Sequence, residues 1–210
     1  IGMTDIARKH KDDPDCVEDC LNKVQASSEY LLDIINNVLD MSRIEAGRIP
    51  IAEAPLLIPT LIDSVVSLMR PGISAKEQML EVDMTGVRQP AVLGDSVHLV
   101  QVFVNILSNA VKFTPEGGRL TLRVCQQPCG EAERGSYAFS FSDTGIGIPP
   151  EFVEHVFDTF SRADGPGCTK TEGTGLGMAI AQKLTELMGG KICCESTLGS
   201  GTTFTVTLNM

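Results

Sequence analysis

The sequence has no excess of positive charge. It carries 17 Lys and Arg against 27 Asp and Glu among 210 residues, a formal net charge of −10. This balance argues against nucleic acid as a partner, because binding to nucleic acid depends on clustered cations. It leaves nucleotides open as ligands, since a local site can be electropositive on an acidic protein.

Paired zinc-binding cysteines are also missing. The sequence has 7 cysteines, but none of them forms the CxxC spacing of a zinc site. Free thiols in a reducing compartment are the favoured interpretation. The alternative is a metal-binding pair formed by Cys16 and Cys20, which lie one helical turn apart. The cysteines are Cys16, Cys20, Cys125, Cys129, Cys168, Cys193 and Cys194.

No apolar run approaches the roughly 20 residues that a membrane-spanning helix needs. No secretory signal is visible, and the chain begins at Ile1 without an initiator methionine. We therefore expect a cytoplasmic fragment of a longer protein, with no membrane contact of its own. Hydrophobic residues make up 42% of the sequence, which is enough for one well-packed domain and a small appendage.

The first 49 residues predict helices. Asp15 is a candidate N-cap after the break at Asp12–Asp15, and Gly47 with Pro50 ends the long helix that follows. Within this helix, mostly apolar residues alternate at spacings of three and four, which indicates a helical bundle between two chains. An ordinary amphipathic helix packed on its own domain is the alternative. The seam consists of Val17, Cys20, Val24, Ser27, Leu31, Ile34, Val38 and Met41.

Residues 50–54 are predicted to be a linker, and residues 55–210 a second domain. This domain mixes helices with strands that are adjacent in sequence, so we expect an α+β fold with a mixed sheet and helices on one face. The predicted helices are Pro59–Met69, Asp95–Phe113 and Leu176–Met188. The predicted strands are Met79–Asp83, Arg119–Val124, Tyr137–Ser142, Lys191–Glu195 and Thr203–Leu208.

A polar stripe runs along the predicted helix Asp95–Phe113. Its members are Gln101, Asn105, Asn109 and Lys112, and they lie beside an apolar face formed by Leu99, Phe103, Ile106, Ala110 and Phe113. Asparagine offers a neutral oxygen ligand that suits a hard cation such as Mg²⁺ when phosphates already neutralise part of its charge. Lysine adds a point charge for a phosphate oxygen.

Two glycine-containing segments strengthen this interpretation. "SDTGIGIP" (Ser142–Pro149) follows a predicted strand, so Asp143 can accept a hydrogen bond from an exocyclic amine such as that of adenine, although the segment could also be a simple turn. "GTGLGMAI" (Gly173–Ile180) precedes a helix, and its exposed amides could bind phosphate. It is neither a Walker loop nor a GxGxxG motif.

Together, these segments and "FDTFSRAD" (Phe157–Asp164) resemble the asparagine, glycine and phenylalanine boxes of sensor histidine kinases. "LLDIINNVLDMSRIEAGRI" resembles the second helix of their dimerisation and phosphotransfer hairpin. The resemblance covers nearly the whole chain. It implies a two-layer α/β sandwich of the Bergerat type, shared with gyrase, mismatch-repair proteins and heat-shock chaperones, preceded by part of a helical hairpin.

The resemblance also implies ligands and roles for individual residues. ATP would bind with Mg²⁺, which Asn109 would ligate with support from Asn105, while Lys112 would contact phosphate. Asp143 would read the adenine amine in a pocket shaped by Gly145 and Gly147.

Two further segments would complete the site. The second glycine box would wrap the phosphates through Gly173, Thr174, Gly175, Leu176 and Gly177. Phe157 and Phe160 would seat a lid over the nucleotide, and Thr202 would help to hold a water molecule near adenine.

Asn105 is informative about the reaction. Hydrolysing members of the superfamily have a glutamate one turn before the metal-binding asparagine, and Asn105 cannot act as such a base. The sequence therefore favours phosphoryl transfer over water attack. The implied function is that of a homodimeric histidine kinase core. It would phosphorylate a histidine upstream of Ile1 for relay to a response regulator, so the chain alone should not phosphorylate itself. The alternatives are a non-catalytic signalling scaffold, a serine-directed kinase of the anti-sigma type and a plain ATPase.

Overall fold

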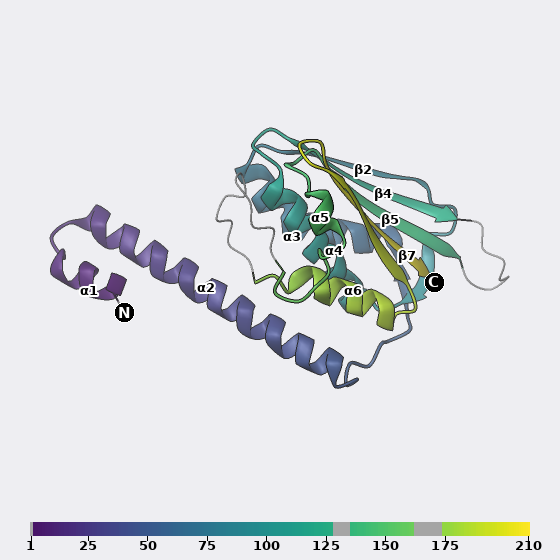
Figure 1. Cartoon of the computed structure of the whole chain (residues 1–210), viewed down its shortest axis with the longest axis horizontal. Coiled ribbons are helices and arrows are strands. Elements are labelled where there is room, and N and C mark those ends of the chain that lie inside the picture. Colours follow the sequence, from purple (N-terminus) through teal and green to yellow (C-terminus); the bar gives the residue numbers. More distant parts are fainter. Residues whose placement is uncertain (1, 128–134, 162–173) are drawn as a thin grey trace.

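The computed structural model describes residues 2–127, 135–161 and 174–210. A helical arm leads into a larger body in which helices pack on a sheet (Figure 1). The arm contains α1 (Gly2–Lys9) and the long α2 (Pro14–Glu45). Part of α2 projects away from the body together with α1, while its C-terminal part lies alongside the body.

Local sequence sets the ends of α2. Asp13, rather than the predicted Asp15, is the N-cap, and its side chain accepts a hydrogen bond from the amide of Cys16. Proline is well suited to the first helical position because its missing N–H would be unpaired there anyway, so Pro14 fixes the helix start one residue after Asp13. At the other end, Gly47 has a φ of 63°, and its amide donates to the carbonyl of Ile44.

The body contains a five-stranded mixed sheet, in the order β2-β4-β5-β7-β6. Strands β2 and β4 run parallel, and the other neighbouring pairs are antiparallel. The strands are β2 (Met79–Gly86), β4 (Arg119–Gln127), β5 (Ser136–Asp143), β6 (Lys191–Thr197) and β7 (Gly201–Asn209). Helices α3 (Ile58–Ala75), α4 (Ser96–Phe113) and α6 (Gly177–Leu187) cover one face of the sheet, which confirms the predicted α+β sandwich (Figure 1).

The core follows from alternation along the strands. Tyr137, Phe139 and Phe141 of β5 are buried, whereas Ser140 and Ser142 lie on the opposite face and pair with threonines of β7. Phe103 of α4 packs on the buried side, with its ring centroid 4.7 Å from that of Phe139.

Some elements differ from the sequence predictions. Helix α3 does not end at Met69 but continues through Pro71 to Ala75, because its apolar face persists as far as the buried Ile73. Three short elements were not predicted, since four residues carry too little periodicity. They are β1 (Ala54–Leu57) and β3 (Ala91–Gly94), which pair antiparallel, and α5 (Pro150–Val153).

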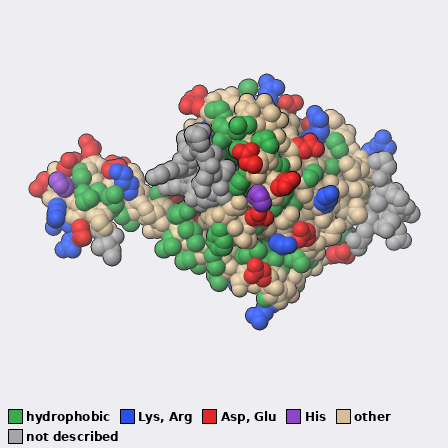
Figure 2. Space-filling model, in the orientation of Figure 1, with side chains coloured by type: hydrophobic (Ala, Val, Ile, Leu, Met, Phe, Trp, Pro, Cys, Tyr) green, Lys and Arg blue, Asp and Glu red, His purple; other side chains and the backbone are tan. Residues whose placement is uncertain are grey.

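Helix α2 contacts the body through its last turns. Ile44 is buried in the core of the body, and Met41 packs against the same core. Several other apolar side chains of α2 are exposed, and Figure 2 shows hydrophobic side chains gathered along its middle. They are Leu21, Leu31, Leu32, Ile35, Val38 and Leu39.

Candidate functional site

Asp95 fixes the start of α4, the helix that carries the polar stripe. Its carboxylate accepts hydrogen bonds from the amides of Val97 and His98 at 3.1 and 3.0 Å, as an N-cap should. It also accepts from the amide of Ala52 at 2.8 Å and pairs with the ring of His98 at 2.7 Å. One buried carboxylate therefore connects the segment after α2 to the beginning of α4.

The polar stripe forms as predicted. Gln101, Asn105, Asn109 and Lys112 are all half-buried along one side of α4. The apolar face is buried except at Phe113, where the prediction was wrong, because this last residue of the helix is 39% exposed. The Phe113 ring instead lies under the ammonium of Lys112, 4.9 Å from its centroid.

Two side chains that the sequence analysis did not single out hold the end of α4. The ammonium of Lys76 donates to the carbonyls of Val111, Lys112 and Thr114 at 2.7–3.1 Å. The amide of Gln78 donates to the carbonyls of Val111 and Thr114. A cation at a helix C-terminus also interacts favourably with the helix dipole, so the turn that carries Lys112 is firmly held.

Asn105 lies where α4 faces the start of α6. Its Nδ2 is buried and has no hydrogen-bond partner among the described residues. A Cβ placed on Gly177 would lie 3.6 Å from Oδ1 of Asn105, so the first residue of α6 stands beside this side chain. A buried donor without a partner costs free energy, and a ligand oxygen at this position would satisfy it.

Asp143 is the last residue of β5. Its Oδ1 accepts a hydrogen bond from the amide of Gly145 at 2.7 Å, and the backbone amide of Thr202 donates a hydrogen bond to the same carboxylate. Burial raises the pKa of Asp143, and the hydrogen bonds, which lower it, offset only part of that effect. Burial also raises the pKa of Cys194 to about 12, with smaller contributions from Cys193 and from the nearby charge of Asp143.

The segment after Asp143 is more than a simple turn, since it is held from two sides. The amide of Ile146 donates to the carbonyl of Phe113 at the end of α4. Gly147 has a φ of 69° and lies so close to the carbonyl of Thr197 that a side chain would overlap it. The amide of Ile148 donates to Oγ of Ser196, a residue the sequence analysis did not select.

Gly145 and Thr202 complete this corner. A Cβ on Gly145 would lie 2.6 Å from the carbonyl oxygen of Phe113, so only glycine fits between α4 and Asp143. Thr202 is buried, and its hydroxyl lies 2.9 Å from that of Ser196. These contacts bring Thr202 next to Asp143, and its role toward water stays a prediction.

The second glycine segment is described from Thr174 onward, while Gly173 lies outside the described residues. The hydroxyl of Thr174 accepts a hydrogen bond from the amide of Leu176 at 3.2 Å, and Leu176 is buried at the N-terminus of α6. Gly175 has a φ of 70°. The carbonyl of Gly175 accepts from the amide of Phe160.

The two predicted aromatic residues have different environments. Phe157 packs edge-on against Phe204, with ring centroids 6.1 Å apart. Phe160 is 66% exposed and has a φ of 61°, an unfavourable conformation for a residue with a side chain. The structure thus connects Phe157 to the core and Phe160 to the backbone of the glycine segment.

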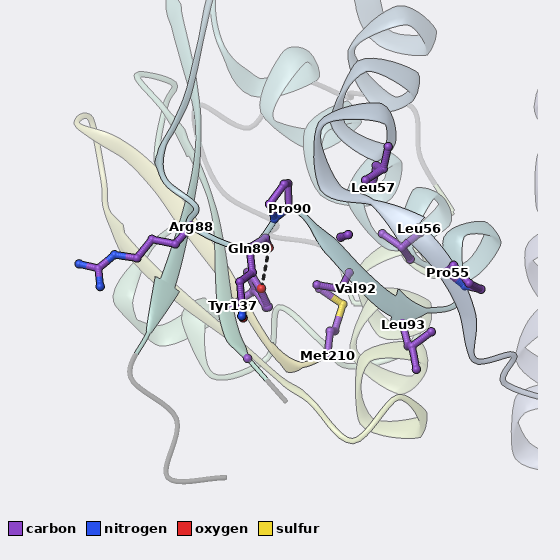
Figure 3. A pocket seen from close by; sticks show the side chains of 12 residues that line it. Pro55, Leu56, Leu57, Arg88, Gln89, Pro90, Val92, Leu93, Tyr137 and Met210 are labelled. Atoms are coloured by element: carbon purple, nitrogen blue, oxygen red, sulfur yellow. Dashed lines mark hydrogen bonds between the residues drawn. The ribbon is translucent and has the colours of Figure 1, made fainter. Parts of the chain in front are cut away.

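One cleft of the described structure lies away from these residues. It has a volume of about 880 Å³ and is lined mainly by β1, β3 and the segment between β2 and β3, with Tyr137 and Met210 (Figure 3). The Tyr137 hydroxyl donates to the carbonyl of Gln89 there. None of the predicted site residues lines this cleft. The candidate site is therefore defined by contacts among α4, β5 and the start of α6.

The described residues also bear on the predictions about thiols, metal ions and membranes. Cys16, Cys20, Cys125, Cys193 and Cys194 are free thiols, and Cys129 and Cys168 lie outside the described residues. Among the residues described, no group of three or more His, Cys, Asp or Glu side chains could hold a metal ion. None of the described helices combines the length and apolar character needed to cross a membrane.

Residues 94–210, which include α4, β5 and both described glycine segments, match the family of histidine kinase-, DNA gyrase B- and HSP90-like ATPases. The chain belongs to this ATPase family. The match covers more than half of the sequence, so the resemblance inferred from the motifs is confirmed at the level of the family.

Similar proteins within the family are sensor histidine kinases. The chain is 33% identical over 210 residues to the sensor histidine kinase GacS of Pseudomonas protegens, covering 23% of that protein. It is 36% identical over 209 residues to the sensory/regulatory protein RpfC of Xanthomonas campestris pv. campestris, covering 28% of it. The chain therefore corresponds to about a quarter of these relatives.

A solved structure supports the same assignment. Full-length ShkA in complex with AMPPNP has a TM-score of 0.76 and 29% identity to this chain, covering 91% of the chain and 38% of ShkA. This coverage exceeds the share of the chain that residues 55–210 make up, so the similarity extends into the arm.

Proposed function

We propose that this chain is the ATP-binding kinase core of a sensor histidine kinase. It would transfer the γ-phosphoryl group of ATP to a histidine outside the 210 residues, for relay to a response regulator. Asn105 is the observation that carries the proposal. Its side chain is an amide, not a general base, and lies one turn before Asn109. Its buried Nδ2 has no hydrogen-bond partner among the described residues, and Gly177 lies beside the same side chain.

The residues fit ATP and Mg²⁺. The side-chain oxygens of Asn109 and Asn105, two half-buried residues, would hold the ion. When bound, the ion would neutralise part of the phosphate charge. Lys112 would contact a phosphate, and the backbone from Thr174 to Gly177 would lie along the phosphate chain. At the opposite end, Asp143 would accept a hydrogen bond from the adenine amine.

The chemistry would rest on position and charge. In phosphoryl transfer, the protein mainly orients the donor and stabilises developing charge. Here α4 is held at its N-terminus by Asp95 and at its C-terminus by Lys76, so its polar stripe has a fixed orientation. A side-chain amide at position 105 cannot deprotonate water, which favours transfer to another acceptor over hydrolysis.

We also propose the partners. The exposed apolar side chains of α2 would form the helical interface of a homodimer, since such a stripe is seldom left in water. The structure of the histidine kinase ThkA in complex with the response regulator TrrA has a TM-score of 0.75 to this chain and 22% identity. That similarity concerns the fold, and a response regulator as partner belongs to the proposal. The free thiols favour a cytoplasmic location.

Nucleotide binding is tested by thermal unfolding of the wild type and Asp143→Ala, with ADP in the presence and absence of Mg²⁺. Ligand at a hundredfold excess over its Kd should stabilise the fold by about 2.7 kcal/mol. For a chain of this size the Tm should rise by roughly 5–10 °C. The shift should require Mg²⁺ and should be lost in Asp143→Ala. No shift in the wild type would favour a non-catalytic scaffold.

The reaction is tested with γ-labelled ATP and the parent protein. We expect acid-labile, base-stable phosphate on the protein, as for phosphohistidine, and no labelling of the 210-residue chain alone. Acid-stable label would favour a serine-directed kinase. Release of phosphate without any labelled protein would favour an ATPase, and stoichiometric acid-labile label on the isolated chain would place the acceptor within it.

A further inference from the structure

Helix α2 makes two polar contacts with the elements that build the nucleotide site. The Nε2 of Gln101 donates to Oδ2 of Asp40 at 2.8 Å, and both side chains are half-buried. The Nδ2 of Asn37 lies 3.4 Å from Oγ1 of Thr174, a longer and weaker contact. Because α2 precedes the ATPase domain in the sequence, both contacts join the arm to that domain.

Both contacts end on groups adjacent to the proposed ligand. Gln101 is the first member of the polar stripe of α4 and stands one turn before Asn105. Thr174 opens the described glycine segment, and its hydroxyl also accepts from the amide of Leu176. Asp40 thus acts on the helix that carries the asparagines, and Asn37 acts on the segment that precedes α6.

The apolar side of the same helix face keeps these contacts in place. Met41 and Ile44 follow Asn37 and Asp40 at helical spacing and pack against the core. This packing already restricts the conformational freedom of the last turns of α2. The two polar contacts therefore form with little further loss of conformational entropy. We define Asn37 and Asp40, with their partners Thr174 and Gln101, as the α2 latch.

We propose that the α2 latch positions the nucleotide site, so that ATP affinity depends on the docking of α2. This inference rests on the proposed function. Asn37 and Asp40 are positioning residues that act through Thr174 and Gln101. In the latched arrangement the glycine segment already stands beside Asn105. Docking should therefore favour nucleotide binding, and by linkage nucleotide should favour docking.

The sign of the effect separates this proposal from simple electrostatics. Asp40 carries a negative charge, and removing it from the neighbourhood of bound phosphates should strengthen nucleotide binding if charge alone matters. If the latch matters, Asp40→Ala should weaken binding because Gln101 loses its acceptor. Asp40→Asn keeps an acceptor oxygen for Gln101 and should bind at least as tightly as the wild type.

The experiment is calorimetric titration of the 210-residue chain with ADP and Mg²⁺. We expect Asp40→Ala to raise the Kd about fivefold, and Asn37→Ala to raise it less, as its contact is longer. Asp33→Ala and Asn36→Ala are matched controls, because both side chains lie on α2 and are exposed. Both controls should bind like the wild type.

Hydrogen exchange provides the reciprocal measurement. ADP with Mg²⁺ should slow exchange of the amides of residues 37–44 in the wild type and in Asp40→Asn, but not in Asp40→Ala. A purely structural role would change basal exchange without abolishing this response to the ligand.

Three results would overturn the latch. Asp40→Ala could bind ADP as tightly as the wild type, Asp33→Ala could weaken binding equally, or nucleotide could leave exchange in residues 37–44 of the wild type unchanged. Failure of the wild type to bind ADP at all would instead refute the proposed function, and the latch with it.

Discussion

Asp95 offers the sharpest test of how the site is held. Its side chain is 5% exposed and accepts hydrogen bonds from the backbone amides of Ala52, Val97 and His98. Asp95→Ala would leave these donors without a partner in a poorly hydrated place. The loss of an N-cap alone costs about 1 kcal/mol, and a hydrogen bond to a charged acceptor contributes about 1.5–3 kcal/mol. Because the amides nearest the surface will bind water instead, we expect a total loss of about 3 kcal/mol.

Urea denaturation of the wild type, Asp95→Ala and Asp95→Asn measures this loss. Asn is also a good N-cap and keeps one acceptor oxygen, so Asp95→Asn should lose only about 1 kcal/mol. The m-value should stay constant, since the surface exposed on unfolding does not change. A loss below about 1 kcal/mol in Asp95→Ala, or equal losses in the two variants, would refute the assignment of Asp95 as the anchor of α4.

The same experiment has a predicted dependence on pH. Burial acts to raise the pKa of Asp95, but hydrogen bonds from Ala52 and His98 and the charge of His98 lower it overall from its usual 3.8. A carboxyl with a lowered folded-state pKa contributes its full stability above the unfolded pKa and loses it as the pH falls through the folded value. The difference between wild type and Asp95→Ala should therefore be constant near neutral pH and shrink below about pH 4.

Two further predictions concern the end of α4 and the adenine pocket. Lys76→Met should lower the free energy of unfolding by about 2 kcal/mol in urea and weaken ADP binding, because three carbonyl contacts at the turn of Lys112 are lost. ADP binding as tight in Lys76→Met as in the wild type would show that the turn of Lys112 keeps its position without these contacts. Asp143→Asn should abolish nucleotide stabilisation yet make the ligand-free fold more stable at pH 7, since burial raises the pKa of Asp143. The charge of Asp143 lowers the stability of the wild type in full above the raised folded-state pKa, and this loss disappears below the unfolded-state pKa of 3.8. The Tm values of the two proteins should therefore converge in acid.

The sequence was sufficient to predict the main elements, because they have strong periodicity. The stripe of α4 was predicted from spacing, and all of its polar members lie on one side of the helix. The sheet strands also alternate clearly, with Leu120, Leu122 and Val124 buried on β4. Short elements were missed for the opposite reason: β1 and β3 have four residues each and are strands only because they pair with one another.

The supporting residues of the site could not be predicted. Lys76 and Ser196 are ordinary polar residues in sequence, and their partners are 35 and 48 positions away. Asp95 was within reach, since it precedes a helix, but its bond to Ala52 depends on how the linker returns to the domain. Phe113 shows an error of the opposite kind. Helical spacing placed it on the apolar face of α4, but it is the last residue of the helix and is exposed.

The shape of α2 has a mechanical consequence. Its 32 residues correspond to a rod of about 48 Å. Among the residues that the structure describes, its polar and core contacts with the body lie in the last turns, from Asn37 onward. About 35 Å of rod lies ahead of that attachment. A tilt of about 10° there would move the start of the helix by roughly 6 Å. Conversely, a displacement of several ångströms at the far end would rotate the attached turns by only a few degrees. A rotation of that size would change the length and angle of the hydrogen bond between Gln101 and Asp40.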